Sequence, residues 1–206
     1  MSVGSFARLS LEAALQLPMT GIVAIDCETT GLGDEARIIQ FAAAFADLNG
    51  LFEGLYCTMV FGDGTTGSDE TRSVHGLSER DLVGAPHFAD AVLPLFKVID
   101  TRTCFAHYAV FDEGRVNHEM DLLGVPHIGR VGCTKTLCEA TGYGQLRLQQ
   151  AAKIFGIDSG VPHDAGDDSI TALRVFLHLS QHHPLETGEY LQREGLIKMP
   201  DTQENN

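Results

Sequence analysis

Two acidic residues stand at the end of an apolar run near the N-terminus. The run "IVAIDCETTG", which begins at residue 22, leads to Asp26 and Glu28, one residue apart. Side chains alternate between the two faces of a strand, so both carboxylates would point the same way and Cys27 the opposite way. At the roughly 6–7 Å between alternate residues of a strand, the two anions repel each other unless something lies between them. A divalent metal ion, an arginine or lysine, or a shared proton would suffice.

A third acid, in a later helical pattern, is also predicted to point inward. In "VPHDAGDDSITALRVFLHLSQ", Asp167 falls on a polar stripe of the helix, so we expect it to be solvated. Asp168 falls instead on an apolar stripe that faces the protein. Asp164 stands near the predicted helix start, close to residue 162, where a carboxylate interacts favourably with free backbone N–H groups. An inward acid needs a partner, which for Asp168 is a buried arginine or a metal ion.

Convergence on a metal ion is the economical interpretation of these acids. Arginines are few, and Asp26, Glu28 and Asp168 would together offer only oxygen ligands. Such hard ligands select Mg²⁺ or Mn²⁺ rather than zinc. His163 precedes Asp168 at the predicted helix start and is free to swing near the same site. A fourth acid, Asp112, falls in the first turn of another predicted helix, on the face that points inward.

Three ordered motifs contain these residues: "DCETTGL" begins at Asp26, "HYAVFD" ends at Asp112, and "HDAGDD" runs from His163 to Asp168. Together they resemble the motifs of the DEDD-type 3′–5′ exonucleases of the histidine-containing branch (DEDDh). This family includes the proofreading epsilon subunit of bacterial DNA polymerase III. The resemblance extends over residues 20–180. It implies an α/β, ribonuclease H-like fold, with a mixed five-stranded sheet flanked by helices.

The resemblance also implies a role for each site residue. Asp26 would bridge two divalent ions, Mg²⁺ or Mn²⁺, with Glu28 and Asp168 holding the first ion and Asp112 supporting the second. His163 would act as general base toward the attacking water, a task suited by a pKa near neutrality. Hydrolysis of the terminal phosphodiester would then release nucleoside 5′-monophosphates.

Substrate contacts are implied for residues beside the first motif, for residues of "VHGL", and for the position after the histidine of the second motif. They are Thr29, Val74, His75, Leu77 and Tyr108. The family usually has asparagine where this chain has Tyr108. An aromatic ring at that position could stack on a base or only fill space.

The elements that would carry these residues alternate as in an α/β domain. Strands are predicted at 22–28, at 36–50 with a turn at Asn49-Gly50, and at 54–62, 103–108 and 130–134. Helical patterns occupy 87–99, 110–124, 135–141, 147–155 and a long stretch from near 162. Pro94 would kink the first of these helices. The Gly-, Thr- and Ser-rich stretch at 62–78 has the composition of a loop.

Length and composition bound the organisation of the chain. At 206 residues, we expect one exonuclease domain at 20–182, a helical extension at 1–19 capped by Ser10, and a C-terminal extension at 183–206. The C-terminal extension is expected to fray, with a disordered end. Five cysteines without a Cys-x-x-Cys pair indicate reduced, mostly buried thiols. Reduced thiols are typical of a cytoplasmic protein, which is what we expect. No apolar stretch approaches the roughly 20 residues of a membrane span.

The net charge of −14 limits how this chain would hold nucleic acid. Proteins that bind many phosphates are usually basic, because their affinity comes from neutralising those charges. Two divalent ions would bring positive charge to a nucleic acid 3′ end, more plausibly of DNA than of RNA. Long processive degradation would need a basic partner, such as a DNA polymerase or a repair protein. The sequence does not indicate an oligomeric state.

Other functions stay open on this evidence. The same chemistry could act on short RNA or on tRNA 3′ ends, and a catalytically silent copy could serve as a scaffold, although every site residue is retained. A zinc site built from His75, His107 and His118 matches no familiar spacing. The loop at 62–69 lacks the lysine of a P-loop and is interpreted as a mobile loop near the substrate. An actin-like ATPase would need further glycine-rich phosphate loops.

Overall fold

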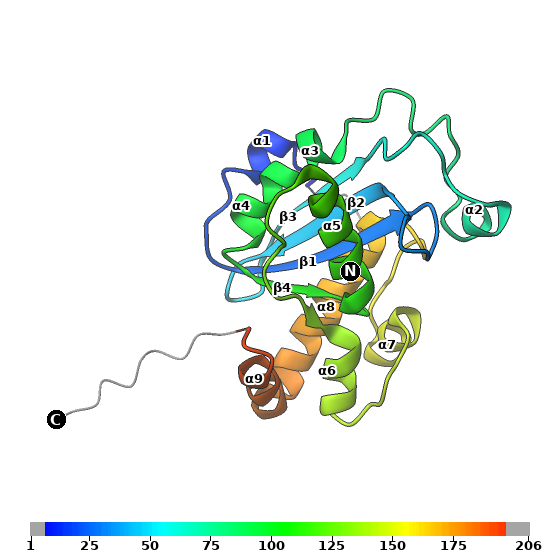
Figure 1. The fold of residues 1–206 in the computed structure, drawn as a ribbon. Coiled ribbons are helices and arrows are strands. Elements are labelled where there is room, and N and C mark those ends of the chain that lie inside the picture. The colour runs from blue at the N-terminus through cyan, green and yellow to red at the C-terminus, as the bar shows by residue number, and fades with distance from the viewer. Residues whose placement is uncertain (1–6, 197–206) are drawn as a thin grey trace.

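The computed structural model describes residues 7–196 and contains a five-stranded sheet in the order β3-β2-β1-β4-β5. The strands are β1 (Ile22–Thr29), β2 (Ile38–Ala46), β3 (Phe52–Met59), β4 (Thr103–Ala106) and β5 (Gly132–Cys133). β2 pairs antiparallel with β1 and β3, whereas β4 pairs parallel with β1 and β5. The predicted mixed five-stranded sheet is therefore confirmed (Figure 1).

Helices cover both faces of this sheet (Figure 1). They are α1 (Leu11–Ala14), α2 (Asp69–His75), α3 (Phe88–Ala91), α4 (Phe96–Ile99), α5 (Ala109–Leu123), α6 (Thr134–Ala140), α7 (Leu148–Phe155), α8 (Ala165–His182) and α9 (Pro184–Arg193), with a 3₁₀ turn at Leu93–Leu95. One buried apolar cluster joins a face of the sheet to α3, α4 and α5. A second cluster joins the opposite face to α6, α7, α8 and α9.

Side chains of β1 point alternately to the two faces of the sheet, and this determines which helical layer its acids face. Val23 and Ile25 belong to the cluster on the α5 side, whereas Ile22 and Ala24 belong to the cluster on the α8 side. Side chains alternate along a strand, so Asp26 continues the set that faces α8. Glu28 follows on the same face, and its carboxylate is directed toward the helix that carries the third motif.

Several predicted boundaries are confirmed by the capping geometry. Ser10 Oγ accepts the N–H of Ala13 and caps α1, as expected. Helix α5 ends at Gly124, whose left-handed backbone (φ 65°) is the usual stop for a helix. Helix α8 starts at Ala165, a few residues later than expected, because the side chain of Asp164 caps it there.

Two stretches depart from the predicted local structure. The stretch at 62–78 is not loop throughout, because it contains α2, which Ser68 caps at its start and the left-handed Gly76 terminates. The helical pattern at 87–99 is broken rather than kinked: it forms α3, a 3₁₀ turn that contains Pro94, and α4. Proline lacks the N–H that a continuous helix requires, so the helix breaks at Pro94.

The C-terminal segment is more ordered than the expected fray. Residues from Pro184 form α9, and the buried hydroxyl of Tyr190 accepts the N–H of Cys133 (2.7 Å) and donates to its carbonyl (3.1 Å). The segment therefore packs on the edge strand β5. The predicted disorder of the chain end concerns residues 197–206, which lie outside the described residues, as do residues 1–6.

The N-terminal segment and the thiols complete the fold. Before α1, the chain runs parallel to β3 through an Arg8–Leu55 bridge, and this covers the outer strand of the sheet. All five cysteines are free, and Cys27, Cys104 and Cys138 are buried, as predicted. Within residues 7–196, no helix combines the length and the apolar character needed to cross a membrane.

Candidate active site

A cavity of about 560 Å³ lies where the C-terminal ends of β1 and β4 meet the first residues of α5 and α8. The five predicted catalytic residues all line it: Asp26, Glu28, Asp112, His163 and Asp168. Four of the five predicted substrate contacts line it as well: Thr29, Val74, His75 and Tyr108. The fifth, Leu77, does not line the cavity. Its N–H instead donates to Nδ1 of His75 (3.0 Å), so it helps to hold that ring.

The two acids of β1 reach the cavity at the end of a buried strand. Asp26 is partly exposed to the cavity, and Glu28 is almost completely buried. Pairing between β1 and β2 becomes irregular between Glu28 and Thr29, and β1 ends at Thr29. A buried strand that ends in this way delivers both carboxylates to one place with little freedom to separate.

Asp112 is held by Cys27, which the sequence analysis predicted only as a buried core thiol. Its Oδ1 accepts hydrogen bonds from the N–H of Cys27 (3.1 Å) and from the Cys27 thiol (3.3 Å). The side chain of Cys27 points away from Asp26 and Glu28, toward the first turn of α5, as alternation requires. β1 therefore presents two acids on one face and fixes a third from the other.

Asp168 is oriented by two N–H donors, one for each carboxylate oxygen. The N–H of His163 donates to Oδ2 (3.0 Å), and Nε2 of Gln149 on α7 donates to Oδ1 (3.2 Å). His163 itself is exposed and has a left-handed backbone (φ 62°), which turns the chain just before α8. One ligand atom each from Glu28, His163 and Asp168 lie within 4.8 Å of one another, a separation that a metal ion can bridge.

The start of α8 is tied to the sheet through Gln40, which sequence reasoning missed. Gln40 is buried in β2, opposite Glu28 in register. Its Nε2 donates to Oδ2 of Asp164 (3.2 Å), and its Oε1 accepts the N–H of Ala165 (3.0 Å). The available signal was a polar residue inside the apolar run "RIIQFAAAFA", because a buried amide requires hydrogen-bonding partners.

Asp167 was expected to be an ordinary solvated acid, and this was incomplete. Its Oδ2 accepts the N–H of Val161 (2.7 Å), and its carboxylate fills the space beside Gly160, where a Cβ would lie 2.4 Å from it. Asp167 thus holds the loop that precedes α8. It does not line the cavity with Asp168, because neighbouring helical residues point in different directions.

Burial and crowding raise the pKa of all four cavity carboxyl groups. For Asp26, burial and then repulsion from Asp112 raise the pKa well above its usual value. For Glu28, burial and then repulsion from Asp168 raise the pKa to about 8. Burial raises the pKa of Asp112 to about 7, although hydrogen bonds from Cys27 oppose this. Burial also raises the pKa of Asp168 to about 6, against the opposing N–H of His163.

Such a group of acids requires either protons or a cation. Within residues 7–196, no lysine or arginine forms an ion pair with any of the four carboxylates, which removes the salt-bridge alternative for them. Near neutral pH the carboxyl groups would share protons unless a metal ion took their place. The donor set, made of carboxylate oxygens and one imidazole, fits a hard divalent cation.

Of the three histidines whose spacing matches no familiar zinc site, His75 and His107 have partners for their ring nitrogens, whereas Nε2 of His118 is buried without a hydrogen-bond partner among the described residues. Nδ1 of His107 pairs with Oγ1 of Thr134 (2.9 Å) and Nε2 with the carbonyl of Leu146 (3.0 Å), so both ring nitrogens have partners. Burial lowers the pKa of His107 to about 4, so it lies beside the site as a neutral ring. Among the described residues, the candidate metal-binding group is that of Glu28, His163 and Asp168, and it includes none of these three histidines.

The glycine-rich loop at 62–69 leads into a wall of the cavity. Gly67 has a left-handed backbone (φ 85°), and a Cβ there would lie 2.0 Å from the carbonyl oxygen of Thr30. The loop is thus closed tightly onto the end of β1. Helix α2, which follows it, contributes Glu70, Thr71, Val74 and His75 to the lining.

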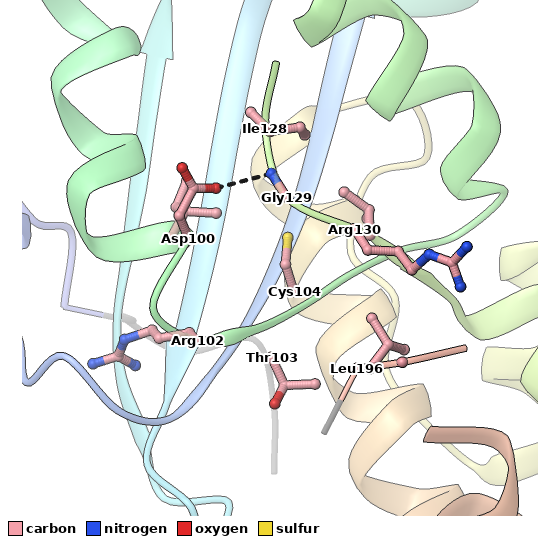
Figure 2. A pocket seen from close by; sticks show the side chains of 11 residues that line it. Asp100, Arg102, Thr103, Cys104, Ile128, Gly129, Arg130 and Leu196 are labelled. Carbon is pink, nitrogen blue, oxygen red and sulfur yellow. Dashed lines mark hydrogen bonds between the residues drawn. The ribbon is translucent and has the colours of Figure 1, made fainter. Parts of the chain in front are cut away.

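A second cavity, of about 270 Å³, lies at the opposite end of β4 (Figure 2). Its one acid, Asp100, accepts the N–H of Gly129 (3.2 Å). Figure 2 shows the guanidinium groups of Arg102 and Arg130 pointing in opposite directions, and they bind Glu53 (2.6 Å) and the carbonyl of Glu194 (2.6 Å), respectively. The charged side chains of this second cavity do not converge on one point, so the first cavity is the candidate active site.

Comparison with known proteins agrees with this geometry. The family model for exonucleases of the RNase T type matches residues 23–176. The chain is 31% identical over 171 residues to the DNA polymerase III subunit epsilon of Treponema pallidum (strain Nichols), and the match covers 80% of this chain and 79% of that one.

Solved structures share the fold at low sequence identity. One is Escherichia coli exonuclease I in complex with a dA16 oligonucleotide, with a TM-score of 0.71, 18% identity and coverage of 82% of this chain and 42% of that chain. Another is a 3′-exonuclease in specific recognition of the 3′ end of a histone mRNA stem-loop, with a TM-score of 0.68, 16% identity and coverage of 79% and 64%. The chain thus spans less than two thirds of these two proteins.

Proposed function

The chain belongs to the RNase T family of exonucleases, and on this premise we propose that it is a metal-dependent 3′–5′ exonuclease acting on DNA. The proposed reaction hydrolyses the terminal phosphodiester and releases a nucleoside 5′-monophosphate. The observation that carries the proposal is the convergence of Asp26, Glu28, Asp112 and Asp168 on one cavity, with His163 exposed at its edge.

The four carboxylates would hold two divalent ions, Mg²⁺ or Mn²⁺. When bound, such ions neutralise charge on the phosphate and lower the pKa of water. The chain supplies the alignment: Cys27 fixes Asp112, while Gln149 and the N–H of His163 fix Asp168. Side chains held in this way need little rearrangement when the substrate binds.

His163 is proposed as the general base. Its backbone turn before α8 leaves the imidazole exposed at the cavity, within reach of the same carboxylates. A neutral imidazole there accepts the proton of the attacking water. The water oxygen forms the new bond to phosphorus, the bond from phosphorus to the 3′-oxygen breaks, and the shortened strand leaves with its 3′-oxygen.

DNA is the proposed substrate because the relative that is 31% identical is a DNA polymerase subunit. RNA is the second candidate, since a 3′-exonuclease with the same fold recognises an mRNA stem-loop. The chain's net charge of −14 fits an enzyme that holds only a few terminal nucleotides. We propose that binding to a longer stretch of the strand is provided by a polymerase or repair protein.

The test compares single-stranded DNA and RNA of one sequence, each labelled at the 5′ end. With Mg²⁺ or Mn²⁺, we expect the DNA to shorten from its 3′ end in a ladder, faster than the RNA, and EDTA to stop the reaction. Asp26→Asn should abolish the ladder, whereas Asp90→Asn, at an exposed acid on α3, should leave it unchanged. Shortening from the 5′ end, equal activity in EDTA, or faster loss of RNA would each contradict part of the proposal.

A further inference from the structure

Tyr108 has an unusual backbone at the edge of the candidate active site. It lines the cavity, is 53% exposed and has a φ of 72° at the start of α5. This left-handed region is unfavourable for a bulky residue and is tolerated best by glycine and asparagine. The chain therefore keeps an exposed aromatic ring at a position whose backbone favours a small amide, and such strain at a cavity suggests a function for the ring.

Lys135 lies against this ring. Its ammonium is 4.7 Å from the centroid of Tyr108, a cation–π distance, and it extends from the first turn of α6. Its charge is near enough to the cavity to contribute to the lowered pKa of His107. Among the described residues, Lys135 takes part in no ion pair with an acidic side chain.

Two other cations lie on helices that contribute residues to the cavity. Arg72 on α2 pairs with Asp69 and Glu79. Arg115 on α5 donates to the carbonyl of Gly33 (2.5 Å). In a strongly acidic chain, Lys135 is thus a cation beside the cavity that can still bind an external anion.

We propose that Tyr108 and Lys135 form a subsite for the nucleotide that precedes the terminal one: its unpaired base stacks on the open face of the Tyr108 ring, and its phosphate contacts the Lys135 ammonium. The proposal rests on the proposed exonuclease function and specifies its substrate as an unpaired strand end. Thr29, Val74 and His75 belong to β1 and α2, a different wall of the cavity, and are left for the terminal nucleotide. A base engaged in a duplex has no free face for such stacking.

The experiment compares two substrates that differ in the preceding nucleotide. One is single-stranded oligothymidylate, and the other is the p-nitrophenyl ester of thymidine 5′-monophosphate, which has no preceding base or phosphate. Tyr108→Asn removes the ring and places a residue that favours the left-handed backbone, so the fold is retained. We expect the ratio of kcat/KM for the oligonucleotide to that for the ester to fall about tenfold, and Tyr108→Trp to restore it.

Lys135→Gln tests the phosphate contact by its salt dependence. We expect the slope of log KM for the oligonucleotide against log salt to fall by about 0.7, the effect of one phosphate on a single strand. Tyr143→Leu and Lys153→Gln, outside the cavity, are the matched controls and should change neither the ratio nor the slope.

The outcomes separate the two proposals. If the wild-type protein hydrolyses both substrates, but Tyr108→Asn lowers both kcat/KM values equally or leaves the ratio unchanged, the subsite is wrong and the exonuclease stands. If the salt slope of Lys135→Gln equals that of the wild-type protein, the proposed contact between Lys135 and the phosphate is wrong. If the wild-type protein hydrolyses neither substrate with Mg²⁺ or Mn²⁺, the proposed function fails, and the subsite fails with it.

Discussion

Gln40 on β2 and Asp164 at the start of α8 are joined by a hydrogen bond of 3.2 Å across 124 residues of sequence. The same amide accepts the N–H of Ala165, so one side chain binds both the cap and the first residue of the helix. His163 and Asp168 flank this point in the sequence. The sheet thereby fixes where the third motif meets the two acids of β1.

Gln40→Leu should lower both stability and activity. The substitution leaves the Ala165 N–H without its partner and breaks one contact of the Asp164 cap, and a buried unsatisfied group costs about 1–3 kcal/mol. We expect a matching drop in the free energy of unfolding by urea, and a lower kcat as α8 shifts. Gln145→Leu, at an exposed glutamine, is the control. Unaltered stability would show that the start of α8 holds its place without Gln40.

His163→Asn should remove the general base while preserving the backbone. Asparagine tolerates the left-handed φ of 62° at this position, so the turn before α8 is retained. We expect kcat to fall by roughly 10²–10⁴-fold, the usual contribution of general base catalysis. His182→Asn, at an exposed histidine near the end of α8, should behave as wild type. A kcat close to that of the wild-type protein would assign the base to another residue.

Divalent ions should stabilise the protein through the four carboxylates. A cation replaces mutual repulsion among buried acids with attraction, and a ligand at one hundred times its Kd adds about 2.7 kcal/mol. We expect Mn²⁺ to raise Tm and EDTA to reverse the rise. Asp168→Asn should reduce the effect, whereas Asp121→Asn, on the exposed face of α5, should not. If the Tm of the wild-type protein does not change when Mn²⁺ is added, the proposed metal site is wrong.

Without metal, stability should fall as pH rises. The pKa values of Asp168, Asp112 and Glu28 are raised to about 6, 7 and 8, so the folded state holds more protons than the unfolded chain. The free energy of unfolding therefore decreases with pH, by about 1.4 kcal/mol per pH unit for each excess proton, from about pH 4 upward through those values.

Urea midpoints measured in EDTA at several pH values test this trend. The decline should flatten with saturating Mn²⁺, because metal binding favours the deprotonated carboxylates. Glu28→Gln should also make the decline shallower in EDTA, since one raised carboxyl group is removed. Stability that increases with pH in EDTA would mean that the acids are compensated by groups other than protons.

Local sequence rules predicted the parts of the site that depend on one element. Alternation placed Asp26 and Glu28 on one face of β1, and helical spacing directed Asp168 inward, where the cavity lies. Helical position also directed Asp112 inward and placed His163 near the same site, the resemblance to known exonucleases implied their roles, and both residues line the cavity. Capping by Ser10 and the stop at Gly124 were predicted for the same reason, because each depends on a few neighbouring residues.

Elements with weak local signals were predicted less well. Helix α2 is short and lies in a stretch rich in glycine, threonine and serine, where composition favours a loop. The segment before it is fixed by a contact with a distant part of the chain, because Gly67 lies so close to Thr30 that a Cβ there would be 2.0 Å from the Thr30 carbonyl oxygen. Helix α9 likewise depends on Tyr190 reaching β5, and no local pattern encodes that contact.

The sequence by itself singled out five residues that line one cavity, and it determined the face of the element that carries each acid. Only the tertiary structure decided how they are held. Cys27 binds Asp112, Gln149 binds Asp168, and Gln40 binds the start of α8. These contacts join residues on separate elements, so they exist only once the sheet and helices have packed. Periodicity is a property of one element, whereas hydrogen bonds between elements, and the raised pKa values that follow from burial, are properties of their arrangement.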